Sequence, residues 1–224
     1  MNEEVSKLIR GRSLPPFIAI EGPIGVGKTT LARRIAKTFQ YQEIFEDPSA
    51  NPFLEKFYED MRQHALATQL SFLFQRTQTI QSLRQSDIFA PRHVADFMLQ
   101  KDPLFARLTL NPEEFDLYDK VYQQLTLDIP RPDLVIYLQA PTNVLLDRIH
   151  RRGIASEGRI SRDYLERLNE IYSEFFLYYD DSPLLIVHAR DIDLAASDPD
   201  YHNLVNSFLD IRNGRHYFNP TFFG

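Results

Sequence analysis

The stretch from residue 22 to residue 29 limits the folds open to this chain more than any other. It reads GPIGVGKT, which matches the pattern G-x-x-x-x-G-K-[ST]. The apolar run PFIAIEG at 16–22 precedes it, and KTTLARRIAKTF at 28–39 follows it with apolar residues at helical spacing. A strand, a glycine-rich turn and a helix in this order form a phosphate-binding loop, because backbone N–H groups and the helix N-terminus then surround an anion. The pattern therefore predicts a P-loop fold that binds a nucleotide.

The residues of this loop have separate expected tasks. Lys28 is expected to reach the β- and γ-phosphates of ATP, and the hydroxyl group of Thr29 is expected to ligate Mg²⁺. The phosphates are expected to lie against the whole loop, which consists of Gly22, Pro23, Ile24, Gly25, Val26, Gly27, Lys28, Thr29 and Thr30. ATP and Mg²⁺ are accordingly the predicted phosphate donor and cofactor.

Short apolar runs alternate with helical patterns along the rest of the chain. Strands are predicted at 16–22, 41–46, 86–90, 133–139 and 184–189. Helices are predicted at 28–39, 52–84 with a break near Asp60, 93–126 with breaks near Pro103 and Pro112, 142–151, 161–180 and 200–211. Strands that alternate with helices form a parallel sheet covered on both faces. We therefore expect a three-layer α/β/α fold with a five-stranded parallel sheet, in a single domain at 16–224 that follows a flexible extension at 1–15.

The composition excludes several classes of protein. The net charge is -6, whereas a general nucleic-acid binder normally has a strong basic excess. No apolar run approaches the roughly 18 residues of a membrane span, and the N-terminal residues lack the apolar region of a signal peptide. The chain has no cysteine, which rules out thiolate metal sites and cysteine nucleophiles and fits a reducing cytoplasm. We predict a cytoplasmic protein that binds neither nucleic acid nor a membrane.

Arginines cluster after the fourth predicted strand, in DRIHRRGIASEGR at 147–159. Arg148, Arg151 and Arg152 recur at helical spacing and so share one helix face. Arginines supply positive charge around a phosphoryl group in transfer, and the glycines at 153 and 158 allow a loop that closes. The pattern predicts a lid at about 148–162. The alternative is a solvated basic helix end, which the helix dipole also favours.

Two further features lie where a substrate is expected. Glu46 and Asp47 follow the second predicted strand, and ligands of open α/β sheets bind at the carboxyl ends of strands. A carboxylate there could accept the proton of a hydroxyl group, although acids at strand ends are also common without a catalytic role. In the apolar helix ATQLSFLFQR at 67–76, Gln69 and Arg76 share one face, so each needs a polar partner in the interior. That partner could be a ligand, a core carbonyl group or a second subunit.

Together these motifs resemble the deoxyribonucleoside kinase family, from about residue 17 to residue 209. Members of this family transfer the γ-phosphoryl group of ATP to the 5′-hydroxyl group of a deoxyribonucleoside. The resemblance implies that Glu46 is the general base and that Lys28, Arg148 and Arg152 act on the transferred phosphoryl group. It further implies contacts to the sugar from Tyr58 and Glu157, to the nucleobase from Gln69, Arg76 and Asp96, and to the adenine of ATP from Arg190 and Asp191.

The residues near the nucleobase are expected to select the substrate. The resemblance implies that Gln69 reads the edge of the base and that Asp96 holds Arg76 against it. Phe72 lies one helical turn after Gln69, where it could stack on the base or belong to the core. An arginine–aspartate pair suits deoxyadenosine, deoxyguanosine or deoxycytidine. The segment NPFLEKFY resembles the bacterial branch of the family, which often prefers the two purines.

The chain departs from the family pattern in three places, one of which is Asp47, where the family commonly has proline or an aliphatic residue. The family often carries an acid-Arg-Ser motif about six residues before the aspartate. With Asp96 as the aspartate, the acid falls on Ala90 and the arginine on Pro91, with Arg92 one place away. In the lid, Ile154 stands where the family has an arginine. The family also implies a homodimer, formed by long helices such as those at 62–84 and 104–126, and a role in nucleotide salvage.

Two other functions remain compatible with these motifs. The GTPase motifs N-K-x-D and D-x-x-G are absent from the sequence, which leaves small-molecule and nucleotide kinases. A nucleoside monophosphate kinase of the thymidylate type also has a P-loop and a lid, but needs an extra arginine for the acceptor phosphate, and Arg92 is the candidate. A nucleotide-binding regulatory protein without turnover would keep the same motifs, because a motif does not prove activity.

Overall fold

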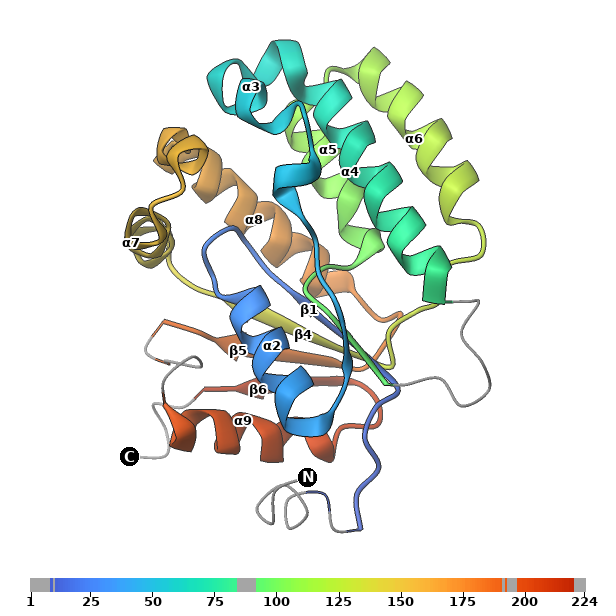
Figure 1. The fold of residues 1–224 in the computed structure, drawn as a ribbon, viewed down its shortest axis with the longest axis vertical. Coiled ribbons are helices and arrows are strands. Elements are labelled where there is room, and N and C mark those ends of the chain that lie inside the picture. Colours follow the sequence, from blue (N-terminus) through green and yellow to red (C-terminus); the bar gives the residue numbers. More distant parts are fainter. Residues whose placement is uncertain (1–8, 10, 84–91, 191, 193–196, 220–224) are drawn as a thin grey trace.

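The computed structural model describes residues 9, 11–83, 92–190, 192 and 197–219. In this part of the chain, six strands form one sheet in the order β2-β3-β1-β4-β5-β6, and every neighbouring pair is parallel (Figure 1). The strands are β1 (Phe17–Glu21), β2 (Gln42–Ile44), β3 (His93–Ala95), β4 (Leu134–Gln139), β5 (Leu184–His188) and β6 (Arg215–Phe218). The predicted parallel α/β fold is confirmed.

Two strands differ from the prediction. The described sheet has six strands rather than five, because β6 adds an edge strand next to β5. Three of the four residues of β6 are exposed, so the segment lacks the apolar run that marks a buried strand. The strand predicted at 86–90 lies outside the described residues. The third strand is instead β3, in a segment predicted as helix, and its three residues are too few to show a periodic pattern.

The helices follow the predicted pattern more closely. They are α2 (Lys28–Phe39), α3 (Leu54–Glu59), α4 (Met61–Leu83), α5 (Asp102–Thr109), α6 (Pro112–Thr126), α7 (Thr142–Arg152), α8 (Arg162–Tyr178) and α9 (Asp198–Leu209), with the 3₁₀ helices η1 (Pro48–Ala50), η2 (Leu99–Lys101) and η3 (Ala155–Arg159). The predicted break near Asp60 separates α3 from α4, because Asp60 has an extended backbone with φ -142° and ψ 92°. Pro103 and Pro112 lie in the first turns of α5 and α6, where proline does not interrupt a helix.

The sheet and its helices bring the carboxyl ends of the central strands together. Helix α2 packs against β1, β2 and β3, whereas α4, α5 and α6 pack on one another and α5 also packs on α8 (Figure 1). Every residue of β1 is buried, and so are the first five residues of β4 beside it. Because β1, β3 and β4 are parallel neighbours, the loops that follow them meet at one edge of the sheet.

The segment before β1 is attached to the fold over its described length. Arg12 forms an ion pair with Asp210 at 3.1 Å and donates a hydrogen bond to Asn206, next to the end of α9. The Tyr41 hydroxyl group donates to the Pro15 carbonyl oxygen at 2.6 Å. Part of the extension that we expected to be flexible, at 1–15, is therefore held against the fold.

None of the helices that the structure describes is both long enough and apolar enough to cross a membrane.

Candidate active site

The glycine-rich loop lies in close contact with β4 and α7. Gly22 has φ +149°, and a Cβ atom there would overlap the carbonyl oxygen of Leu138 at the end of β4. Gly25 has φ +82°, and a Cβ atom there would lie 2.8 Å from Cγ1 of Ile149 in α7. Both positions therefore need glycine for its backbone freedom and for its missing side chain. The loop is fixed in place between a strand end and the helix that leads into the arginine-rich segment.

Lys28 turns back onto the loop that precedes it. Its ammonium group donates hydrogen bonds to the carbonyl oxygens of Gly22 at 2.8 Å and Pro23 at 3.2 Å. Burial, reinforced by the positive charge of Lys101, lowers the pKa of Lys28 to about 8, while Glu21 and nearby acids oppose the shift. This is a site that favours an additional negative charge, such as a phosphate.

Asp96 connects the phosphate loop to the end of β2. Its Oδ2 atom accepts a hydrogen bond from the Thr29 hydroxyl group at 2.5 Å, and its Oδ1 atom accepts one from the backbone N–H of Glu46 at 2.9 Å. A hydroxyl group beside a carboxylate is an oxygen donor set that suits Mg²⁺ carried by nucleotide phosphates. Among the described residues, no group of three or more His, Cys, Asp or Glu side chains could hold a metal ion by itself.

Glu46 and Asp47 have different environments. The Glu46 carboxylate is largely buried and forms an ion pair with Arg76. Burial acts to raise the pKa of Glu46, but the positive charges of Arg76, Lys101 and Lys28 outweigh it, so the pKa is lowered. Asp47 is exposed, and its carboxylate caps η1 by accepting from the backbone N–H of Ser49 at 3.0 Å. Of the two acids, Glu46 is the one that is largely buried and whose pKa responds to Lys28 of the phosphate loop.

Arg76 does not pair with Asp96, which corrects our expectation. The guanidinium group lies between two other carboxylates, those of Glu46 and Asp102, and its distance to Asp102 Oδ1 is 2.5 Å. It also lies over the ring of Phe72, with 4.8 Å from Cζ to the ring centroid. Asp96 directly follows β3 and contacts the phosphate loop through Thr29, whereas Asp102 begins α5, which packs against α4.

Asp102 was missed by the sequence analysis, although a spacing signal was available. The family's acid-Arg-Ser motif precedes its aspartate by about six residues. If Asp102 is that aspartate, the acid of the motif falls on Asp96 and the arginine falls on Phe97. Ala90 and Pro91, which we assigned to the motif, lie outside the described residues, and Arg92 is exposed before β3. In that alignment, the acid of the motif is Asp96, which lies beside Thr29, and a phenylalanine occupies the position of its arginine.

The Arg76–Asp102 pair is buried with unused hydrogen-bonding capacity. Arg76 Nε, Asp102 Oδ2 and the Tyr118 hydroxyl group have no hydrogen-bond partner among the described residues. Burial raises the pKa of Asp102 to about 6, against the opposing effect of Arg76 and Lys101. Polar atoms this deep in the protein normally have partners, so the cluster is suited to a polar ligand such as a nucleobase.

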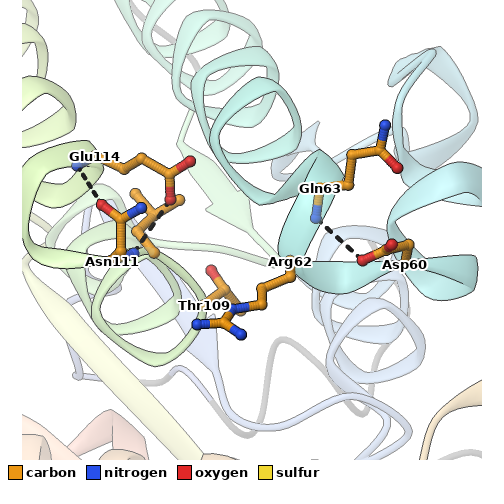
Figure 2. Close-up of a pocket in the computed structure, with 7 residues that line it drawn as sticks. Asp60, Arg62, Gln63, Thr109, Asn111 and Glu114 are labelled. Atoms are coloured by element: carbon orange, nitrogen blue, oxygen red, sulfur yellow. Dashed lines mark hydrogen bonds between the residues drawn. The ribbon is translucent and has the colours of Figure 1, made fainter.

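Gln69 and Tyr58 lie on separate helices rather than on one continuous helix. Gln69 is buried in α4 and donates a weak hydrogen bond to the Thr109 hydroxyl group at 3.4 Å. On its other side, Thr109 lines a surface pocket between the start of α4 and the α5–α6 connection, and Arg62 extends toward Thr109 in that pocket (Figure 2). Tyr58 is in α3, where burial and the neighbouring Tyr164 and Glu157 raise its pKa.

The arginines of the predicted lid separate into different contacts. Arg148 donates to the carbonyl oxygen of Val26 in the phosphate loop at 3.1 Å and to that of Ala189 after β5 at 2.7 Å. Arg152 forms an ion pair with Glu157 across the end of α7. Arg148 therefore holds the loop directly, whereas Arg152 and Glu157 hold each other.

The rest of the lid also contacts the helical side of the molecule. Arg159 of η3 forms an ion pair with Glu59 of α3 at 2.5 Å, so the segment after α7 contacts the helix that carries Tyr58. Ile154, where the family has an arginine, is exposed. Beyond β5, Arg190 is exposed, and Asp191 lies outside the described residues.

A buried ion pair behind the phosphate loop was also missed. Glu21, the last residue of β1, is fully buried and accepts hydrogen bonds from the backbone N–H groups of Gly22 and Met98 and from the Tyr172 hydroxyl group. The ammonium group of Lys101, itself buried, lies 3.4 Å from Glu21 Oε1. The only signal in the sequence was an acid at the end of the apolar run FIAIE.

Comparisons with known proteins give a consistent result. A family model described as deoxynucleoside kinase matches residues 18–211. Deoxyguanosine kinase of Bacillus subtilis (strain 168) is 39% identical over 160 residues, which are 70% of this chain and 76% of that protein. Deoxyadenosine/deoxycytidine kinase of the same organism is 28% identical over 205 residues, which are 87% of this chain and 92% of that protein. A solved structure of deoxyadenosine kinase from M. mycoides with bound dATP has a TM-score of 0.74 at 27% identity, and the match covers 85% of this chain and 98% of that chain.

Proposed function

Because the chain belongs to the deoxynucleoside kinase family, it transfers the γ-phosphoryl group of ATP to the 5′-hydroxyl group of a deoxyribonucleoside, and we propose that deoxyguanosine or deoxyadenosine is its preferred acceptor. One observation supports this proposal more than any other. A single guanidinium group, that of Arg76, joins Glu46 at the phosphate loop to Asp102 in the buried polar cluster. The 5′-hydroxyl end and the base end of a bound deoxyribonucleoside would thus both contact the connected charges of Glu46, Arg76 and Asp102.

The chemical step is assigned to Glu46. Its carboxylate takes the proton of the 5′-hydroxyl group while the hydroxyl oxygen forms a bond to the γ-phosphorus atom. The bond from that phosphorus to the bridging oxygen of the β-phosphate breaks, and ADP leaves with the electron pair. The positive charges of Lys28, Arg148 and Arg152 stabilise the negative charge on the phosphoryl group during its transfer. Most of the catalysis therefore comes from positioning and electrostatics.

The acceptor is proposed to bind through both of its ends. Tyr58 and Glu157 hold the 3′-hydroxyl group, a role supported by the influence of the Glu157 charge on the pKa of Tyr58. Gln69 reads the base edge with the donor and acceptor of its amide, and the Arg76–Asp102 pair extends that reading. Phe72 supports the same guanidinium group from its ring face, so its proposed task is to orient Arg76.

The donor is proposed to bind on the opposite side of the loop. The backbone of residues 22–30 holds the phosphates of ATP, and Arg190 with Asp191 borders its adenine. Thr29 and the adjacent Asp96 offer oxygen ligands to Mg²⁺. Mg²⁺ supplies charge neutralisation at the β- and γ-phosphates when it is bound.

We propose that the enzyme is a cytoplasmic homodimer that takes part in nucleotide salvage. Helices α4 and α6 lie side by side, and they expose the large apolar residues Phe74 and Leu117 at 46% and 51% of their surface (Figure 1). Exposed apolar side chains on neighbouring helices fit an interface between two copies of this chain.

The preference for purines is tested by competition. With ATP, Mg²⁺ and equal concentrations of the four deoxyribonucleosides, the ratio of initial product rates gives the ratio of kcat/KM values. We expect deoxyguanosine and deoxyadenosine to have the highest values. If thymidine or deoxycytidine exceeded both, the proposed preference would be wrong although the kinase activity would stand.

A further inference from the structure

Lys101 is a buried cation to which the mechanism above gives no task. It is the last residue of η2, and its side chain is 3% exposed. Its ammonium group lies 3.4 Å from Glu21 Oε1 and 5.2 Å from the centroid of the Phe105 ring. Among the described residues these are the only ion-pair and ring contacts of Lys101. A lysine this deep in a protein normally has a close partner for its charge, so its position needs an explanation.

Glu21 does not fully provide that explanation. Its carboxylate already accepts three hydrogen bonds, from Gly22 N at 3.0 Å, Met98 N at 2.9 Å and the Tyr172 hydroxyl group at 2.8 Å. These contacts are all shorter than the 3.4 Å to Lys101. A carboxylate with three donors is well satisfied, and the contact to Lys101 is the longest of the four.

The charge of Lys101 acts instead on the reacting groups. After burial, Lys101 is the largest influence that lowers the pKa of Lys28, and it also acts on the pKa values of Glu46 and Asp102. Lys28 donates a hydrogen bond to the Gly22 carbonyl oxygen, and Lys101 lies 3.4 Å from the carboxylate of the preceding residue, Glu21. Two cations held at the same end of the phosphate loop favour a further anion besides Glu21. The phosphoryl group that passes from ATP to the acceptor is such an anion.

The sequence around Lys101 fits the same conclusion. With Asp96 as the acid beside Thr29, the arginine position of the acid-Arg-Ser motif is occupied by Phe97. Phe97 is buried and packs beneath the Arg76 guanidinium group, 5.9 Å from Cζ to its ring centroid. Phe97 has no charge, whereas Lys101, four residues later, places a positive charge near the end of β1.

We propose that Lys101 is a catalytic residue that contacts the transferring phosphoryl group and replaces the arginine missing at Phe97. This inference rests on the proposed kinase mechanism. Together with Lys28 from the phosphate loop, Lys101 would then surround the phosphoryl group from the side of η2. Glu21 keeps Lys101 in place between turnovers without removing its charge.

The test compares Lys101→Met and Lys101→Arg with the unmodified enzyme and with Lys120→Met, an exposed lysine of α6 that serves as the control. Removing one pre-positioned contact to a transition-state charge typically costs about 10²-fold or more in kcat. We expect Lys101→Met to lower kcat by about 10²-fold while the KM values for ATP and deoxynucleoside change by less than about threefold. Lys101→Arg should recover at least a tenth of the lost kcat, and Lys120→Met should match the unmodified enzyme.

Two double variants separate catalysis from a structural task. In Glu21→Gln/Lys101→Met both buried charges are removed. If Lys101 only balances the charge of Glu21, this double variant should regain the kcat of the unmodified enzyme. That result would overturn the proposal. In Phe97→Arg/Lys101→Met a cation is restored at the motif position, and we expect kcat to rise above that of Lys101→Met. Thermal unfolding of each variant identifies those that fail to fold.

The outcomes also separate this proposal from the proposed function. If the unmodified enzyme phosphorylates no deoxynucleoside, the proposed function itself is wrong. If it does so and folded Lys101→Met retains its kcat, Lys101 is not a catalytic residue and only this inference fails.

Discussion

At the scale of single residues, three carboxylates near the phosphate loop make different contacts. Glu46 is largely buried and pairs with Arg76. Asp96 fixes the Thr29 hydroxyl group and the backbone of Glu46. Asp102 pairs with Arg76 from the other side. We propose that Glu46 serves proton transfer, Asp96 the metal side of the phosphates and Asp102 the recognition of the base.

Replacing Glu46 by glutamine tests the first of these assignments. Glu46→Gln keeps the shape of the side chain but cannot accept a proton, so kcat should fall by roughly 10²–10⁴-fold. The KM for the deoxynucleoside should change little. Asp47→Asn, at the exposed neighbour that caps η1, should keep its kcat. Steady-state kinetics with ATP and deoxyguanosine give both values, and a near-normal kcat for Glu46→Gln removes it from the role of base.

Replacing each of the two aspartates by asparagine in turn tests whether Asp102, rather than Asp96, is the functional partner of Arg76. Asp102→Asn should change the relative kcat/KM values of the four deoxynucleosides, because it alters the pair that we propose reads the base. Asp96→Asn should instead lower kcat with all four by a similar factor, because it acts on Thr29 and Glu46. The reverse pattern would restore Asp96 as the base-reading residue.

The pKa of Asp102 predicts a dependence of stability on pH. Folding raises this pKa from 3.8 to about 6, so the folded protein holds the proton more strongly than the unfolded chain. The contribution of Asp102 is therefore greatest at low pH and is lost as the pH rises through about 6. Relative to Asp102→Asn, the free energy of unfolding of the unmodified protein should fall between about pH 4 and pH 7, as measured by urea denaturation. A difference that rises with pH would contradict the assignment.

The site residues that could be predicted are those with a local signal. Lys28 and Thr29 follow from the loop pattern, and Glu46 from its place after a strand. The partner of Arg76 could not be read in this way, because Asp96 and Asp102 are both acids near the start of a helical segment, and only the packing of α5 on α4 distinguishes them. Lys101 gave no signal, since a single lysine is ordinarily a surface residue.

At the scale of elements, the phosphate loop depends on β4 and α7 as much as on its own sequence. Gly22 lies against the carbonyl oxygen of Leu138, and Gly25 against Ile149. The elements that were missed explain the limits of the sequence pattern: β3 has three residues, and β6 is mostly exposed. The longer helices were predicted because ten or more residues suffice to show a helical period.

Substitution of Gly22 tests this close packing. Gly22→Ala places a methyl group against backbone that cannot move aside, at a backbone conformation unfavourable for alanine, and should destabilise the fold by about 3 kcal/mol or more. For a chain of this size that corresponds to a fall in Tm of roughly 6–12 °C. Gly158→Ala is the control, because a Cβ atom there meets nothing within 4 Å, and its Tm should remain within about 2 °C. Equal Tm values for both variants would contradict the described packing of the loop.

At the scale of the whole molecule, we propose that the exposed apolar residues Phe74 of α4 and Leu117 of α6 belong to a dimer interface. Phe74→Glu combined with Leu117→Glu places two charges on this face, so a dimer that uses it should dissociate to a chain of 26.2 kDa in sedimentation experiments. Leu177→Glu, at an exposed apolar residue of α8, is the control and should leave the dimer intact. A double variant that stays dimeric would exclude α4 and α6 as the interface.

The function of the whole molecule is defined by which compound accepts the phosphoryl group. The direct measurement incubates the enzyme with ATP, Mg²⁺ and either a deoxynucleoside or its 5′-monophosphate, and follows ADP together with the identity of the product. We predict that deoxyguanosine and deoxyadenosine give their 5′-monophosphates with equimolar ADP, and that the monophosphates themselves are not phosphorylated. Turnover of monophosphates alone would identify a nucleoside monophosphate kinase, and absence of ADP with every acceptor would contradict the assignment of a deoxynucleoside kinase.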